Sequence, residues 1–354
     1  MILKSTQEQT TMTQPRISII VPCLNEARHI RHCIESVLRQ EEPEGGFEVI
    51  VADGLSGDGT RDTLSALARQ DSRLRLVDNP GKIASTALNV AIGEARGSII
   101  VRVDAHTEYS QDYVKNCVSA LESTSADNVG GAARTKATNY LQAAVSAAYH
   151  CPLVVGGARF HNVDYEGYVD TVVYGCWRRS AFERFGYFDE ELIRNQDDEF
   201  NLRIIRNGGR IWQSAKIKSW YRPRTSLRAL FKQYAQYGYW KVRVIQKHHL
   251  PASWRHLVPG AFVLALGTLS VLALFSLRAF WIWLAVLAAY ALLCLAASFS
   301  SASRSGWKLL PVLPAVVGCY HFGYGYGFLR GLLDFVIRGR ANIPSFSTLT
   351  RNQI

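Results

Sequence analysis

Acidic residues are almost absent from the second half of this 354-residue chain. Residues 200–354 carry 20 Lys and Arg but a single acid, Asp334, whereas residues 1–199 carry the other 28 acids. The stretch 201–257 alone holds 13 Lys and Arg and no acid. Such a run needs an anionic partner, and nucleic acid, a phospholipid surface and a phosphorylated substrate all satisfy that requirement.

Several common signatures are also missing. A hydrophobic content of 48% excludes a disordered chain, and no internal repeat is visible. Neither G-x-x-x-x-G-K-[ST] nor G-x-G-x-x-G occurs, which disfavours P-loop hydrolysis and dinucleotide redox chemistry. The seven cysteines lack C-x-x-C spacing, so reduced thiols are expected. Residues 1–15 form a polar tail without the apolar core of a signal peptide, which predicts that the polar half stays inside the cell.

Long hydrophobic runs are present near the C-terminus. Residues 258–277 and 279–299 are uncharged and separated only by Arg278, so each can cross about 30 Å of hydrocarbon as a helix. The alternative is two buried helices of a soluble protein. Residues 309–333 predict a third span, a re-entrant segment or an interfacial helix within a membrane region 258–336, and residues 337–354 form a tail.

The charges that flank these runs predict their orientation. Basic residues lie directly before the first run and directly after the second, so both ends of the hairpin are expected on the cytoplasmic side. The sequence therefore predicts a multi-pass protein of the inner (cytoplasmic) membrane with a cytoplasmic catalytic domain. A lipid surface or a phosphorylated substrate then explains the basic run at residues 201–257. We therefore expect no nucleic-acid partner.

The polar half, residues 16–225, alternates two kinds of hydrophobic pattern. Short β-branched runs at 17–21, 48–52, 74–77 and 98–103 predict strands, and the segments 26–40, 60–70 and 84–95 between them predict helices. Strands and helices that alternate at this spacing indicate an α/β fold with a parallel sheet. In such folds ligands bind beyond the carboxyl ends of the strands.

Polar and acidic residues follow three of these strands: Pro22 to Glu26 follow the first, Asp53 to Thr60 the second and Asp104-Ala105-His106 the fourth. Each segment alone can be a helix cap. Together they converge on one edge, where carboxylates repel unless a cation or ligand holds them. One carboxylate and one imidazole two residues apart, Asp104 and His106, suit Mg²⁺ or Mn²⁺ shared with substrate phosphates.

A further acidic cluster, Asp197-Asp198-Glu199, precedes hydrophobic residues at helical spacing. The acids are therefore expected at a helix N-terminus, where the helix dipole favours the ionised form. Capping is the simpler explanation, but three adjacent acids repel one another more than a cap requires. One of them can serve as a general base for an acceptor hydroxyl.

The motifs together resemble those of family 2 inverting glycosyltransferases with the GT-A fold, over about residues 15–250. The narrower resemblance is to membrane-bound bacterial glucosyltransferases of the succinoglycan type. The motifs are Pro22-x-x-Asn25-Glu26, Asp53-Gly54-x-Ser56-x-Asp58-Gly59-Thr60, Asn79-Pro80-Gly81-Lys82, Asp104-Ala105-His106 and Gln196-Asp197-Asp198-Glu199-Phe200.

The resemblance implies roles for individual residues. Asp197 would be the catalytic base, chosen over Asp198, and Asp104 and His106 would hold the metal at the place of the family's D-x-D. The residues implied in substrate binding are Pro22, Asn25, Glu26, Asp53, Lys82, Asp104, Asp198 and Trp240.

The basic segment 226–257 supplies the last motif. Residues 236–240 resemble the Q-x-x-R-W of processive synthases, but Tyr239 stands where Arg is expected. The segment can be an amphipathic helix lying on the membrane, or Trp240 can belong to the acceptor site. We therefore expect the transfer of one sugar from UDP-glucose or a similar donor to a polyprenyl-diphosphate-linked saccharide in exopolysaccharide biosynthesis. The alternatives are a processive synthase, a membrane-tethered nucleotidyltransferase and a non-catalytic nucleotide-sugar binding protein.

Overall fold

The computed structural model describes residues 14–340 and 344–347. Its first half alternates strands and helices as the sequence predicts, because each β-branched run is buried as a strand between amphipathic helices. The elements are β1 (Ile17–Cys23), α1 (Ile30–Leu38), β2 (Phe47–Asp53), α2 (Thr60–Gln70), β3 (Leu74–Asp78), α3 (Ala84–Glu94) and β4 (Ile99–Arg102).

The main sheet is mixed. Strands β1 to β4 are parallel to one another, in the order β3-β2-β1-β4. The order continues with β9 (Val173–Arg178), β6 (Asn128–Gly131), β10 (Ile211–Gln213) and β8 (Gly167–Tyr168), of which β9 is antiparallel to both β4 and β6. The sheet therefore carries the carboxyl ends of β1, β2 and β4 along one edge.

A smaller sheet and several helices surround that edge. The small sheet pairs β5 (Glu108–Tyr109), β11 (Ser219–Tyr221) and β7 (Arg134–Thr135). The helices are α4 (Tyr113–Ser123), α5 (Tyr140–Tyr149), α6 (Pro152–Val155), η1 (Arg159–His161), α7 (Ser180–Phe185) and α8 (Gln196–Arg206). The acids of the predicted cluster lie in the first turn of α8, as expected.

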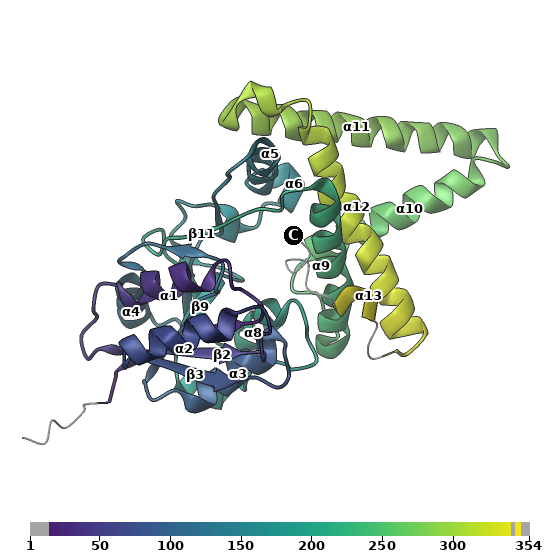
Figure 1. The fold of residues 1–354 in the computed structure, drawn as a ribbon. Coiled ribbons are helices and arrows are strands. Elements are labelled where there is room, and N and C mark those ends of the chain that lie inside the picture. The colour runs from purple at the N-terminus through teal and green to yellow at the C-terminus, as the bar shows by residue number, and fades with distance from the viewer. Residues whose placement is uncertain (1–13, 341–343, 348–354) are drawn as a thin grey trace, which may run out of the picture.

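The C-terminal half is helical. Figure 1 shows α12 running beside α9, while α10 and α11 project away from the α/β domain. The helices are α9 (Leu227–His248), η2 (Trp254–His256), α10 (Val258–Leu272), α11 (Leu277–Ser305), η3 (Trp307–Leu309), α12 (Leu313–Gly331), the π-helix η4 (Leu332–Ile337) and α13 (Pro344–Ser347).

Two of these segments are long and apolar enough to cross a membrane, Trp254–Leu272 and Leu277–Ser305. The turn between them comes earlier than the sequence suggests. Helix α10 ends at Leu272, and the Ser276 side chain caps α11 by accepting a hydrogen bond from the Ala279 backbone N–H. Arg278 therefore lies in the first turn of α11 and does not separate the two helices. A serine at this position satisfies an N–H that the helix itself leaves unpaired.

The third hydrophobic segment, predicted at residues 309–333, forms a packed helix. Helix α12 lies so close to α9 that a Cβ added at Gly327 would be 1.9 Å from the Ala235 carbonyl oxygen. A Cβ at Gly238 would likewise be 2.1 Å from the Tyr324 carbonyl oxygen. Among the described helices, α12 is not one of those long and apolar enough to span a membrane. Small residues on both helices allow this close approach.

Helix α9 packs against α12 on one side and against the first half of the chain on the other, and the membrane contact expected of residues 226–257 stays a prediction. Its basic residues meet acids of the first half of the chain: Lys241 pairs with Asp198, Arg243 with Glu191 at 2.8 Å, Lys247 with Asp189, and His248 with Glu199 at 2.9 Å. Arg255, just beyond the helix, pairs with Asp170. The anionic partner of much of the basic run is therefore the protein's own acidic half.

Candidate active site

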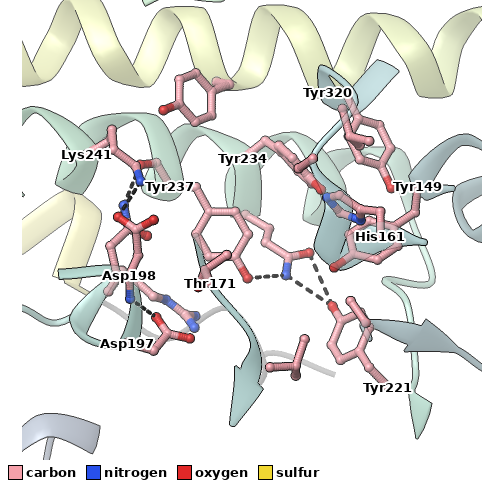
Figure 2. A pocket seen from close by; sticks show the side chains of 18 of the residues that line it. Tyr149, His161, Thr171, Asp197, Asp198, Tyr221, Tyr234, Tyr237, Lys241 and Tyr320 are labelled. Atoms are coloured by element: carbon pink, nitrogen blue, oxygen red, sulfur yellow. Dashed lines mark hydrogen bonds and ion pairs between the residues drawn. The ribbon is translucent and has the colours of Figure 1, made fainter. Parts of the chain in front are cut away.

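A cavity of about 940 Å³ lies where the α/β domain meets the helical half. Its walls combine the ends of β1 and β4, the start of α8 and parts of α5, α6 and α9 to α12. Figure 2 shows the side chains at its centre. The predicted site residues that line it are Pro22, Glu26, Lys82, Asp104, His106, Asp197 and Asp198.

Asp104 and His106 face this cavity with a third residue, Glu26. The Glu26 carboxylate lies 3.0 Å from Nδ1 of His106, so Nε2 of His106 is left to bind another group. A carboxylate that orients a histidine in this way is common around protein metal ions. No group of three or more His, Cys, Asp or Glu ligands exists in the described part of the chain. One carboxylate and one imidazole fit an ion that takes its other ligands from substrate phosphates and water.

Arg102 is a charged residue of the site to which the sequence analysis gave no role. Its Nε donates to Asp104 at 2.9 Å, and its Nη1 is buried without a hydrogen-bond partner. Burial opposes the charge of this guanidinium, but Asp104 and Asp197 outweigh it and raise the pKa of Arg102 above its usual value. A permanent cation therefore lies near both the predicted metal ligand and the predicted base.

The three adjacent acids of α8 have different surroundings. Asp198 pairs with Lys241, and Glu199 pairs with Arg203 at 2.7 Å and with His248. Burial raises the pKa of Asp198, but Lys241 and its cationic neighbours hold that pKa below the usual value. Asp197 forms no salt bridge with any described residue and accepts a hydrogen bond from the Asp198 backbone N–H at 2.9 Å. Figure 2 shows Asp197 next to the Asp198–Lys241 pair.

Asn25 and Asp53 lie behind the cavity wall. The Asn25 side-chain carbonyl accepts a hydrogen bond from the Gly57 N–H at 3.1 Å, and the Asn25 backbone N–H donates to Ser56 Oγ at 2.8 Å. Asp53 is fully buried, where it accepts hydrogen bonds from Ser56 and pairs with Arg61 at 3.2 Å. These bonds hold the loop that follows β2 against Asn25, and direct contact of Asn25 and Asp53 with a nucleotide stays a prediction.

Trp240 does not line the cavity, so the structure does not bring it together with the other predicted site residues, and its role in the acceptor site stays a prediction. The ring is 1% exposed, and its indole N–H donates to the Phe346 carbonyl at 3.2 Å. Neighbouring positions on α9, Tyr237 and Lys241, line the cavity instead. Neighbouring residues of a helix point about 100° apart. Trp240 therefore packs against Phe346 while Lys241 faces the cavity.

The sequence analysis also missed an aromatic and basic part of the cavity. It is built by residues from seven separate segments, so no motif spacing could have identified it. The residues are Arg134, Tyr149, Tyr174, Arg194, Tyr221, Arg224, Gln233, Tyr234, Tyr237 and Tyr320. Of these, Tyr237 alone lies in a motif that the sequence analysis described, residues 236–240.

The mixed sheet, with acids at the carboxyl ends of its parallel strands beside one cavity, is the arrangement of a glycosyltransferase of the GT-A fold. The family model described as glycosyl transferase family 2 matches residues 18–186. The succinoglycan biosynthesis protein ExoA of Rhizobium meliloti (strain 1021) is 33% identical over 330 residues, which cover 92% of this chain and 97% of that protein. The chain therefore belongs to glycosyl transferase family 2.

Two other proteins extend the comparison. A dolichyl N-acetyl-alpha-D-glucosaminyl phosphate 3-beta-D-2,3-diacetamido-2,3-dideoxy-beta-D-glucuronosyltransferase of Methanococcus voltae is 27% identical over 90% of this chain and 97% of its own length. The solved structure of the mannosyltransferase PcManGT from Pyrobaculum calidifontis, in complex with GDP-Man and Mn²⁺, aligns with a TM-score of 0.59 at 23% identity. It covers 84% of this chain and 88% of that one, so the shared fold extends into the helical half.

Proposed function

We propose that the protein transfers one sugar, with inversion, from UDP-glucose or a similar nucleoside diphosphate sugar to a hydroxyl of a polyprenyl-diphosphate-linked saccharide. The observation that carries this proposal is the position of Asp197, an acid that pairs with no cation among the described residues, in the same cavity as Asp104 and His106. The name of one relative, a succinoglycan biosynthesis protein, supports a role in exopolysaccharide biosynthesis. The name of another supports a lipid-linked sugar phosphate as the acceptor.

In the proposed reaction Asp197 accepts the proton of the acceptor hydroxyl as that oxygen attacks the anomeric carbon of the donor. The new carbon–oxygen bond forms as the bond to the nucleoside diphosphate breaks on the opposite face, which inverts the configuration in one step. Mg²⁺ or Mn²⁺ held by Asp104 and His106 would neutralise charge on the diphosphate. Arg102 and Lys82 add fixed positive charge on the same side of the cavity.

The alternatives fit the structure less well. A nucleotidyltransferase needs a substrate phosphate as nucleophile and has no use for a hydroxyl-activating base at Asp197. A processive synthase would carry Arg at position 239, where Tyr239 instead stacks on Phe346 with ring centroids 4.2 Å apart. Transfer of a single sugar is therefore preferred.

A membrane location is part of the proposal. Of helix α10 only Gly260 is buried, and the turn that follows exposes Leu274 and Phe275 by 79% and 83%. Apolar surface of this extent needs a partner, and lipid is the partner that suits two uncharged helices. We propose that the α10–α11 hairpin enters the inner membrane from the cytoplasmic side.

The test is sugar transfer from a panel of radiolabelled nucleotide sugars to extracted membrane lipids. Wild type is expected to label lipid with one donor, and Asp197→Asn to be slower by about 10²–10⁴-fold. Asp62→Asn, an exposed acid on α2, serves as the matched control and should transfer normally. Equal transfer by Asp197→Asn would refute the base, and no transfer with any donor would refute the proposed activity.

A further inference from the structure

Arg102 is the one charged residue in a run of aliphatic residues, Ile99 to Val103, that forms strand β4 and its end. It is 4% exposed and lines the cavity. An arginine is almost never buried this deeply unless its charge is paired. The partner of Arg102 is Asp104, one of the two residues proposed to hold the ion. A buried cation therefore lies directly beside the proposed ion site.

The two proposed ligands of the ion have partners of opposite charge. His106 is paired with the Glu26 carboxylate, which adds negative charge and favours a cation. Asp104 is paired with the Arg102 guanidinium, whose Nε and Nη2 donate to the two carboxylate oxygens at 2.9 and 3.3 Å. Arg102 therefore neutralises the carboxylate through both of its oxygens, and it repels a second cation that approaches them.

The Arg102 side chain is also held in its place. Its guanidinium lies over the Tyr174 ring of the neighbouring strand β9, 5.9 Å from the ring centroid. Among the described residues, Asp104 is the only hydrogen-bond partner of this side chain. Moving the guanidinium away from Asp104 would leave a buried charge unpaired, which is strongly unfavourable. An ion that binds Asp104 therefore shares this carboxylate with Arg102 instead of displacing it.

We propose that Arg102 makes ion binding at Asp104 and His106 depend on the nucleoside diphosphate. The ion alone meets a carboxylate that Arg102 already neutralises, so it binds weakly. With the diphosphate, the phosphate oxygens supply the further negative charge and the ligands that Mg²⁺ and Mn²⁺ need. This inference rests on the proposed function, which assigns the ion to Asp104 and His106, and adds to it the residue that couples the ion to the donor.

A purely structural role for Arg102 predicts a different result. If Arg102 served only to fill its place in the sheet, its substitution would lower stability and would leave the ion affinity of the folded protein unchanged or lower. Under the proposal, removing the charge raises the affinity for the free ion, because one of the two cations that compete for Asp104 is gone. Loss of structure does not produce a gain of ion binding, so this gain separates the two roles.

The experiment measures Mn²⁺ bound to the purified full-length protein in detergent micelles by equilibrium dialysis, because Mn²⁺ and its nucleotide complexes pass the dialysis membrane and the protein does not. Mn²⁺ is offered alone, with UDP and with GDP. Wild type is expected to bind Mn²⁺ alone weakly, and about tenfold or more tightly with one of the nucleotides. Arg102→Gln keeps a donor for Asp104 but removes the charge, so it is expected to bind Mn²⁺ alone about tenfold or more tightly than wild type does. Arg102→Lys keeps the charge and should behave as wild type does.

Two further variants serve as controls. Arg96→Gln, at an exposed arginine outside the cavity, should bind Mn²⁺ as wild type does under all three conditions. Asp104→Asn sets the level of Mn²⁺ that is held elsewhere on the protein.

Free Mn²⁺ bound by Arg102→Gln no more tightly than by wild type would overturn the proposal. If that variant does not fold, the wild-type measurement remains decisive. Mn²⁺ bound by wild type equally well with and without nucleotide, or not above the Asp104→Asn level, would also overturn the proposal. No sugar or acceptor is present, so ion binding is measured separately from sugar transfer. Transfer that fails while these binding differences hold would refute the proposed activity and leave the coupling of ion and nucleotide standing.

Discussion

At the residue scale, the chemistry of this protein depends on which charges are already neutralised. Three acids are adjacent on α8, but two of them form ion pairs. Asp198 pairs with Lys241, and Glu199 pairs with Arg203 and His248. A carboxylate in a short, buried ion pair is a poor proton acceptor, because protonation would leave the partner cation unpaired. Of these three acids, Asp197 is the one that forms no salt bridge with a described residue, which favours it as the proposed base.

The contact between Glu26 and His106 makes a testable prediction about metal binding. Glu26→Gln keeps the size of the side chain but removes the charge that orients His106. Loss of such an orienting carboxylate typically lowers metal affinity by about 10–100-fold. Titration of Mn²⁺ in the presence of nucleoside diphosphate measures the change, and Glu183→Gln, an exposed acid of α7, is the control. Unchanged affinity would show that His106 does not bind the ion.

His161 predicts a pH dependence of stability. Burial, together with His150 and Arg255, lowers the pKa of His161 from its ordinary value of 6.5 to about 3. At pH 5 the His161 side chain is protonated in the unfolded chain but not in the folded protein. The free energy of unfolding is therefore unaffected by this residue above pH 6.5 and decreases as the pH falls below that value. Between pH 7 and pH 5 the loss is about 1–2 kcal/mol. Thermal unfolding at both pH values should show a smaller difference for His161→Gln than for wild type. An equal difference would mean that other groups cause the pH dependence.

At the element scale, the contact between α9 and α12 decides the architecture of the helical half. Gly238 of α9, together with Gly323 and Gly327 of α12, lies against the backbone of the opposite helix. This contact places Tyr234 and Tyr237 of α9 and Tyr320 of α12 around one cavity. The packing of two helices thus builds a wall of the site.

Substitution of these glycines should separate the helices. Gly327→Ala would place a Cβ 1.9 Å from the Ala235 carbonyl oxygen, so one helix must move. Overpacking of this kind costs about 1–3 kcal/mol, and here backbone rather than a flexible side chain is in the way. Gly267→Ala on α10 is the matched control, because a Cβ there meets nothing within 4 Å and alanine favours a helix. Denaturant unfolding should show the loss only for Gly327→Ala, and equal stability of the two variants would contradict the close packing.

At the scale of the whole molecule, the uneven charge of the chain has an internal explanation. The basic second half contacts the acidic first half through six pairs between acids at positions 170–199 and bases at positions 241–255. The two halves therefore neutralise each other at the surface where they meet. The apolar α10–α11 hairpin takes no part in this pairing, and many of its large hydrophobic side chains are exposed.

The exposed tip of the hairpin predicts how the molecule meets a membrane. Replacing Leu274 and Phe275 together by Asp would place two charges at the tip, which must pass the bilayer centre before both helices can span the membrane, and each charge costs about 2.5–3.5 kcal/mol there. In flotation with lipid vesicles this variant should stay in the soluble fraction while wild type floats. Ile205→Asp, at an exposed position of α8, is the control and should float. Flotation of the tip variant would refute insertion of the hairpin.

The sequence by itself determined the strands β1 to β4, the acids that follow them and the two apolar helices. These features depend on local patterns, because β-branched runs favour strands and an acid that directly follows a strand lies at the edge of the sheet. The family resemblance also pointed correctly to a family 2 glycosyltransferase. Its implied roles for individual site residues stay predictions.

Only the tertiary structure decided how these parts are combined. It paired Asp198 with Lys241, placed Trp240 outside the cavity, packed α12 against α9 and brought Arg224 and Ala289 to the same cavity. Each outcome depends on contacts between residues far apart in the chain. Local hydrophobic and charge patterns show that a residue will be buried or ionised, but the partner it meets is set by the packing of whole elements.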